Sequence, residues 1–179
     1  MTRTLSLALT LIAVTACVPD DVDWQTTDDD SATTPEDDST VPDDGATAAD
    51  PALVGSWSST GNNISSLLSG DPFHIVLVSA DFHADGTYDV YSQDADGQGA
   101  DFSGTYGVVL STTPHTIVLQ QTAPYAATSE GIYQVDSAQL QYEIVQTLPD
   151  YGFTPPTAFG TTDGPGVSPG TNVQLFERQ

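Results

Sequence analysis

Apolar and polar residues alternate over several short stretches between residues 51 and 179. Tyr106, Val108 and Leu110 are separated by single residues, and Leu140 and Tyr142 are spaced in the same way. A period of two residues is typical of a strand that buries one face. Turn-forming residues separate these stretches. They predict eight strands, at residues 53–59, 73–84, 87–93, 102–111, 115–121, 131–135, 139–147 and 171–177.

The strongest turn signal is Asp85-Gly86, which joins two of the predicted strands. An Asp-Gly pair between alternating stretches is typical of a hairpin. Phe82 and Tyr88 should then face each other across the turn. Because short turns join strands with one polar face, the sequence predicts an all-β domain over residues 51–179. Its expected form is an antiparallel barrel, or a sandwich, with one short helix.

The short helix is expected directly after the first strand. Ile64, Leu67 and Leu68 fall on one helical face, and either asparagine at positions 62–63 could cap the N-terminus. Gly70 could end the helix. Such a helix would cover one end of a barrel. The alternative is an irregular loop with a few buried leucines.

Residues 148–170 contain five prolines and five glycines. This composition excludes a helix and a central strand. Tyr151, Phe153 and Phe159 favour an ordered segment. Three forms are open: a strap packed on the barrel wall, a lid over its open end, or a disordered loop.

The first 16 residues have the pattern of an export signal. Arg3 precedes an apolar run of 12 residues, from Leu5 to Ala16, which is shorter than the about 20 residues of a transmembrane helix. The run ends at Val14-Thr15-Ala16-Cys17, which resembles the lipobox of bacterial lipoproteins. The resemblance implies that residues 1–16 are removed and that Cys17 carries the lipid that anchors the chain. The alternative is ordinary secretory cleavage beside an incidental cysteine.

A strongly acidic segment follows the cysteine. Residues 19–50 hold 12 of the 25 acidic residues, and almost none of the others is apolar. Such a segment cannot bury enough apolar surface to offset the entropy lost on ordering, and charge repulsion should extend it. Residues 17–50 are therefore predicted to be a disordered tether between the lipid and the domain.

Three motifs of the domain resemble bacterial lipocalin-like proteins. Gly55-Ser56-Trp57 is similar to the Gly-x-Trp signature of the first lipocalin strand. Residues 82–88 and Ser103-Gly104-Thr105-Tyr106 are similar to the F-x-x-D-G-T-Y and G-T-Y motifs of these domains. The resemblance covers about residues 53–147. It implies a lipocalin-like barrel whose floor is closed around Gly55 and Trp57.

The same resemblance implies a binding site for a small apolar ligand in the barrel mouth. The residues expected to line it are Phe82, Tyr88, Val90 and Tyr106. The long outer helix of lipocalins is missing from the sequence. Arg178 could correspond to the arginine near the last lipocalin strand.

The chain has a formal net charge of −23, with two basic residues and no lysine. This charge narrows the classes of molecule that it could bind. Phosphate binding needs clustered Lys or Arg, so the charge argues against a nucleic acid partner. It also argues against electrostatic adsorption to anionic lipid. Without lysine the chain has no Schiff-base chemistry and no P-loop. A single cysteine excludes an internal disulfide and a Cys-rich zinc site.

Reactive clusters are few. Alternation places Asp81, His83 and Asp85 on one strand face, where they could act as zinc ligands. If the neighbouring Phe82 points into the core, however, these three side chains point to solvent. Residues 94–99 match only the start of a calcium loop, because Thr105 stands where the bidentate glutamate belongs. No Gly-x-Ser-x-Gly motif is present. The sequence predicts no metal site, no cofactor and no catalytic residue.

Together these features predict a monomeric, non-enzymatic lipoprotein of the cell envelope that binds a small apolar ligand. Val18 differs from the Asp that retains some lipoproteins at the inner membrane, so we expect the outer membrane of a bacterium with two membranes. One alternative is a structural or protein-interaction module whose barrel is filled by side chains, with an unknown partner. A weaker alternative is a secreted hydrolase.

Overall fold

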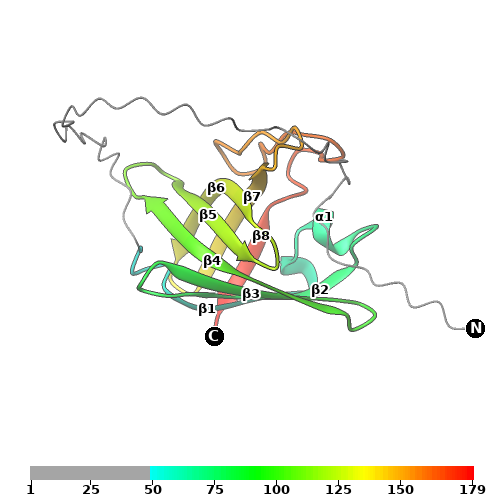
Figure 1. The fold of residues 1–179 in the computed structure, drawn as a ribbon, viewed down its shortest axis with the longest axis horizontal. Coiled ribbons are helices and arrows are strands. Elements are labelled where there is room, and N and C mark those ends of the chain that lie inside the picture. The colour runs from blue at the N-terminus through cyan, green and yellow to red at the C-terminus, as the bar shows by residue number, and fades with distance from the viewer. Residues whose placement is uncertain (1–48) are drawn as a thin grey trace, which may run out of the picture.

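The computed structural model describes residues 49–179, which form eight antiparallel strands closed into a barrel (Figure 1). Each strand pairs with the next along the chain, and the last pairs with the first. The predicted signal peptide, Cys17 and nearly all of the acidic tether lie outside the described residues. The strands are β1 (Gly55–Thr60), β2 (Ile75–Phe82), β3 (Thr87–Asp94), β4 (Gly99–Val109), β5 (His115–Ala123), β6 (Ala127–Asp136), β7 (Gln139–Leu148) and β8 (Gln174–Arg178).

All eight predicted strands are present, and the fold is the barrel rather than the sandwich. The largest difference is at β6, which begins at Ala127 instead of residue 131. Thr128 to Glu130 show no apolar alternation, yet they pair with both β5 and β7. Backbone pairing on both sides therefore extends the strand where the side chains give no signal.

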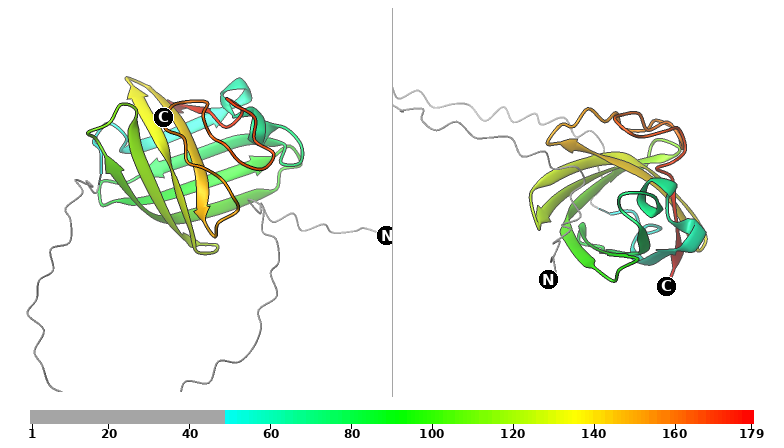
Figure 2. Two further views of the ribbon diagram at one scale, coloured as in Figure 1. Left: turned by 90° about the horizontal axis from the view of Figure 1, so that it is seen from above. Right: turned by 90° about the vertical axis from the view of Figure 1, so that its right-hand side faces the viewer.

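The segment after β1 forms two short helical turns, η1 (Gly61–Asn63) and α1 (Ser66–Ser69). The predicted cap at Asn62 or Asn63 is wrong. The cap is Ser65, whose hydroxyl accepts a hydrogen bond from the Leu68 N–H at 3.3 Å, while both asparagines lie in η1. Gly70 ends α1 as predicted. Figure 2 shows η1 and α1 lying across one end of the barrel.

Residues 149–173, called the strap below, connect β7 to β8 along the outside of the barrel (Figures 1 and 2). Apart from one bridge between Thr154 and Asp163, the strap has no regular secondary structure. Its main anchor is the fully buried Glu143 of β7, whose carboxylate accepts hydrogen bonds from the N–H groups of Gly160 and Thr162. Of the three forms left open by the sequence, the packed strap is the one observed.

The hairpin predicted at Asp85-Gly86 is present. Phe82 and Tyr88 are direct partners across the Asp85-Gly86 turn, with ring centroids 6.5 Å apart. A β-bulge shifts the register between Ser103 and Gly104. A Cβ atom on Gly104 would overlap the backbone of Gln120, so the close approach of β4 and β5 requires glycine there.

Candidate functional site: a cavity inside the barrel

A cavity of about 200 Å³ lies inside the barrel. Inward-facing side chains of β2 to β8 line it, and Leu68 of α1 contributes from one end. Most of the lining is apolar or aromatic, including Val78, Ala80, Leu119, Ile144 and Phe176. The barrel is therefore not filled completely by its own side chains.

Strand alternation explains how β2 builds one wall of the cavity. Val78, Ala80 and Phe82 are buried and face inward. The pairing of β2 with β3 shifts between Ile75 and Leu77, which leaves Val76 on the outside with 45% of its surface exposed. Two valines close in sequence thus lie on opposite sides of the wall.

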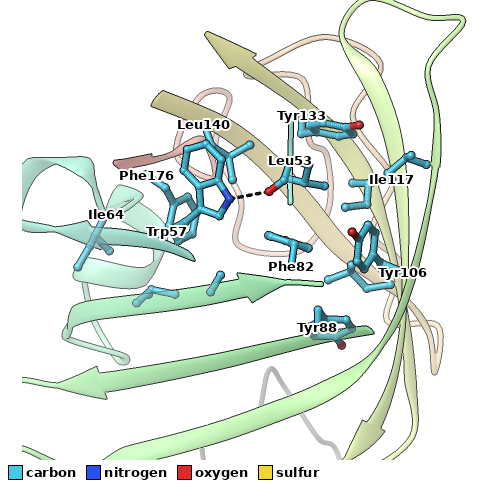
Figure 3. Packing of buried hydrophobic residues seen from close by; sticks show 14 of the residues in the cluster. Leu53, Trp57, Ile64, Phe82, Tyr88, Tyr106, Ile117, Tyr133, Leu140 and Phe176 are labelled. Carbon is cyan, nitrogen blue, oxygen red and sulfur yellow. Dashed lines mark hydrogen bonds between the residues drawn. The ribbon is translucent and has the colours of Figure 1, made fainter. Parts of the chain in front are cut away.

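The end of the barrel opposite to α1 is closed by a tightly packed group of side chains, called the floor below (Figure 3). Trp57 is almost completely buried, and its indole N–H donates a hydrogen bond to the Leu53 carbonyl at 2.7 Å. Tyr133 is also buried, and its hydroxyl donates to the Asp50 carboxylate at 2.8 Å. Neither Trp57 nor Tyr133 lines the cavity, which lies between this floor and α1.

The residues expected to close the barrel and to line the cavity separate into two groups. Phe82, Tyr88 and Val90 line the cavity. Tyr106 does not: it is buried, packs edge-on against Phe82 at 5.2 Å, and donates from its hydroxyl to the His83 carbonyl at 2.8 Å. Gly55 and Trp57 belong to the floor. A Cβ atom on Gly55 would lie 2.6 Å from a guanidinium nitrogen of Arg178, and its φ is +135°.

Three residues around the cavity come from connecting segments that the sequence did not link to a site. Leu68 lies in α1, Tyr125 in the β5–β6 turn and Asn172 at the end of the strap. The amphipathic pattern around Leu68 was the only available signal, and it indicates burial rather than a ligand. For Tyr125, which is 38% exposed, the sequence does not indicate whether an aromatic side chain in a hairpin turn points toward the barrel or away from it.

The polar groups that line the cavity are neutral. Ser92, Gln146 and Gln174 are all buried, and the amide of Gln146 donates to the Pro149 carbonyl at 3.3 Å. Among the residues that the structure describes, no Asp, Glu, Lys, Arg or His lines the cavity. Burial raises the pKa of Tyr88 to about 12 and also raises that of Tyr142, so both phenols stay protonated near neutral pH.

All histidines and acidic residues of the described domain lie outside the cavity lining. His83 Nε2 lies 3.1 Å from an Asp89 carboxylate oxygen on the exposed face of the hairpin, opposite to Phe82. Asp94 accepts hydrogen bonds from the N–H groups of Asp96 and Gln98 and so stabilises its own turn. Between residues 49 and 179 no three His, Cys, Asp or Glu side chains come together as metal ligands would.

No protein-family model, curated protein or solved structure matches this chain. In the part of the chain described by the structure, no helix has the length and apolar character needed to cross a membrane.

Proposed function

We propose that this chain is a lipid-anchored protein of the bacterial cell envelope whose barrel binds a small, mainly apolar ligand. The observation that carries the binding function is the cavity of about 200 Å³. Its lining within residues 49–179 is mostly apolar and includes no Asp, Glu, Lys, Arg or His. Concave, mainly apolar sites with a few polar groups are the usual form of small-molecule sites in proteins. The mouth of an eight-stranded barrel is a common place for them.

The volume limits the size of the ligand. An apolar cavity of about 150 Å³ stays dry and holds benzene. A cavity of about 200 Å³ should therefore hold a ligand, or the buried part of one, with roughly eight to ten non-hydrogen atoms. This argues for a compact molecule and against a complete long-chain lipid inside the barrel.

Two further features support a lipocalin-like binding protein in the envelope. The eight-stranded antiparallel barrel is compatible with such a fold, and Arg178 lies over the Trp57 ring at the floor. For the membrane anchor, the supporting observation is the sequence Val14-Thr15-Ala16-Cys17 after a short apolar run. The proposed place is the outer membrane, with no catalytic role for the domain. The proposed tether ends before Asp50, because this residue is buried and accepts a hydrogen bond from Tyr133 in the floor.

The binding function is tested by native mass spectrometry of residues 18–179 produced in the host without the lipid. The expected result is an additional mass that disappears when the protein is denatured. Val78→Phe should fill the cavity and remove this mass. Val76→Phe is the matched control, because it adds the same side chain on the outside of the same strand. A bare mass for the unmodified chain, or equal effects of the two variants, would contradict binding in the cavity and favour the interaction module.

The anchor is tested separately with Cys17→Ala in the full-length chain. The variant should lose lipid labelling and accumulate as unprocessed or soluble protein. If it is labelled and fractionates with membranes as the unmodified chain does, Cys17 is not the anchor. This result would leave the binding function untouched.

A further inference from the structure

We propose that the cavity selects an uncharged ligand that carries a hydrogen-bond acceptor, most simply a carbonyl oxygen, and that the side-chain amide of Gln174 donates to it. This inference rests on the proposed binding function and narrows its ligand class. The observation behind it concerns Gln174. Among the described side chains that line the cavity, this is the one with a buried donor atom that has no hydrogen-bond partner.

Gln174 is the first residue of β8 and is 5% exposed. It lies on the same strand face as Phe176, and its direct partner on β7 is Tyr142, which also lines the cavity. The side-chain nitrogen Nε2 has no hydrogen-bond partner among the described residues. An amide N–H that is buried without a partner is costly, so such groups in native proteins call for a partner that the protein alone does not supply.

Two other buried polar side chains show what is special about this position. Gln146 also lines the cavity, but its amide nitrogen already donates to the Pro149 carbonyl at 3.3 Å. Ser59 has an unpartnered hydroxyl oxygen but does not line the cavity. Among the described residues that line the cavity, Gln174 is the one whose side-chain donor nitrogen is itself buried and has no partner, and a ligand oxygen would satisfy it.

The charge around the cavity excludes an ionised ligand. Of the side chains from residues 49–179 that line the cavity, none carries a charge that could neutralise a carboxylate or an ammonium group. Arg178, the one basic side chain of the domain besides histidine, lies at the floor and donates to the carbonyls of Ala52 and Val54. The acidic surface of the chain also repels anions before they reach the barrel.

The test uses three probes of similar size with residues 18–179: acetophenone, which has a carbonyl oxygen; cumene, its hydrocarbon counterpart; and benzoate, which is charged. Their affinities are measured by titration for the unmodified chain, Gln174→Met and Gln146→Met. In Gln174→Met the affinity for acetophenone should fall about 2- to 12-fold, as expected for one lost hydrogen bond, while that for cumene should stay equal or rise. Gln146→Met should change both alike, and benzoate should bind the unmodified chain more weakly than acetophenone.

The outcomes separate this inference from the proposed function. If cumene binds but Gln174→Met leaves acetophenone unchanged or weakens both probes equally, Gln174 is not the donor and the apolar binding function stands. Benzoate binding as tightly as acetophenone would overturn the neutral ligand class. If neither cumene nor acetophenone binds, the binding function fails and this inference fails with it. Gln174→Leu gives the same comparison should Gln174→Met not fold, which circular dichroism would show.

Discussion

The guanidinium group of Arg178 lies over the indole ring of Trp57, with its central carbon 4.1 Å from the ring centroid. The same group donates hydrogen bonds to the carbonyls of Val54, at 2.9 Å, and Ala52, at 2.5 Å. The seam between β1 and β8 contains only two residue pairs, and Trp57–Arg178 is one of them. One side chain therefore ties the last strand to the segment before the first, at the shortest seam of the barrel.

We predict that Arg178→Lys destabilises the barrel by about 1–3 kcal/mol, because a single ammonium group cannot lie flat on the indole and reach both carbonyls. Arg178→Ala should cost at least as much. Urea denaturation of residues 18–179 measures both values.

Glu177→Gln is the control for Arg178, since it changes a charge at the neighbouring exposed position. It should alter the free energy of unfolding by no more than about 0.5 kcal/mol. A lysine variant as stable as the unmodified chain would show that neither the ring contact nor the paired hydrogen bonds matter for closure.

Most of the fold could be predicted from the sequence, because each strand of a barrel buries one face and so carries the period of two residues. The helix cap could not. Ser65, Asn62 and Asn63 are all acceptable cap residues, and only the path of the chain from β1 over the barrel end decides among them. The sequence also predicted that residues 148–170 lack regular structure, which holds except for Leu148, the last residue of β7. It did not predict that Glu143 of β7 holds this segment through Gly160 and Thr162.

The candidate site could be predicted only in part, for a physical reason. Alternation tells which face of a strand a residue occupies but not how deep along the barrel it lies. Tyr106 has the expected face yet fills the space beside Phe82 instead of lining the cavity. The sequence predicts a strand at Gln174 but no role for its side chain. That the side-chain amide is buried without a hydrogen-bond partner can be recognised only from the structure, in which β8 pairs with β7.

We predict that Glu143→Gln releases the strap from the barrel wall. The carboxylate is fully buried and accepts hydrogen bonds from Gly160 N–H, Thr162 N–H and the Thr162 hydroxyl, with no donor of its own. An amide would place one NH₂ group against these donors. The free energy of unfolding should fall by about 2–3 kcal/mol, and chymotrypsin should cleave after Phe153 or Phe159 much faster.

Glu130→Gln is the matched control for Glu143. Glu130 lies on the adjacent strand β6, and its carboxylate accepts a hydrogen bond from Thr147 of β7 rather than from the strap. Its cleavage pattern should equal that of the unmodified chain. Equal cleavage of the Glu143 variant and the control would mean that other contacts, such as Asn172 with the Ile144 carbonyl at 2.8 Å, hold the strap.

The last prediction concerns alkaline pH. Burial raises the pKa of the Tyr88 phenol from 10.0 to about 12 in the folded barrel, so the unfolded chain releases this proton first as the pH rises. The stability that the neutral phenol contributes is therefore complete below pH 10 and is lost progressively as the pH approaches 12. Tyr88→Phe should flatten the decline of the urea midpoint between roughly pH 10 and pH 12. Some decline should remain, because burial also raises the pKa of Tyr142. Parallel declines for the two proteins would show that Tyr88 ionises equally easily in the folded and unfolded chain, and that the cavity wall around it is open to water.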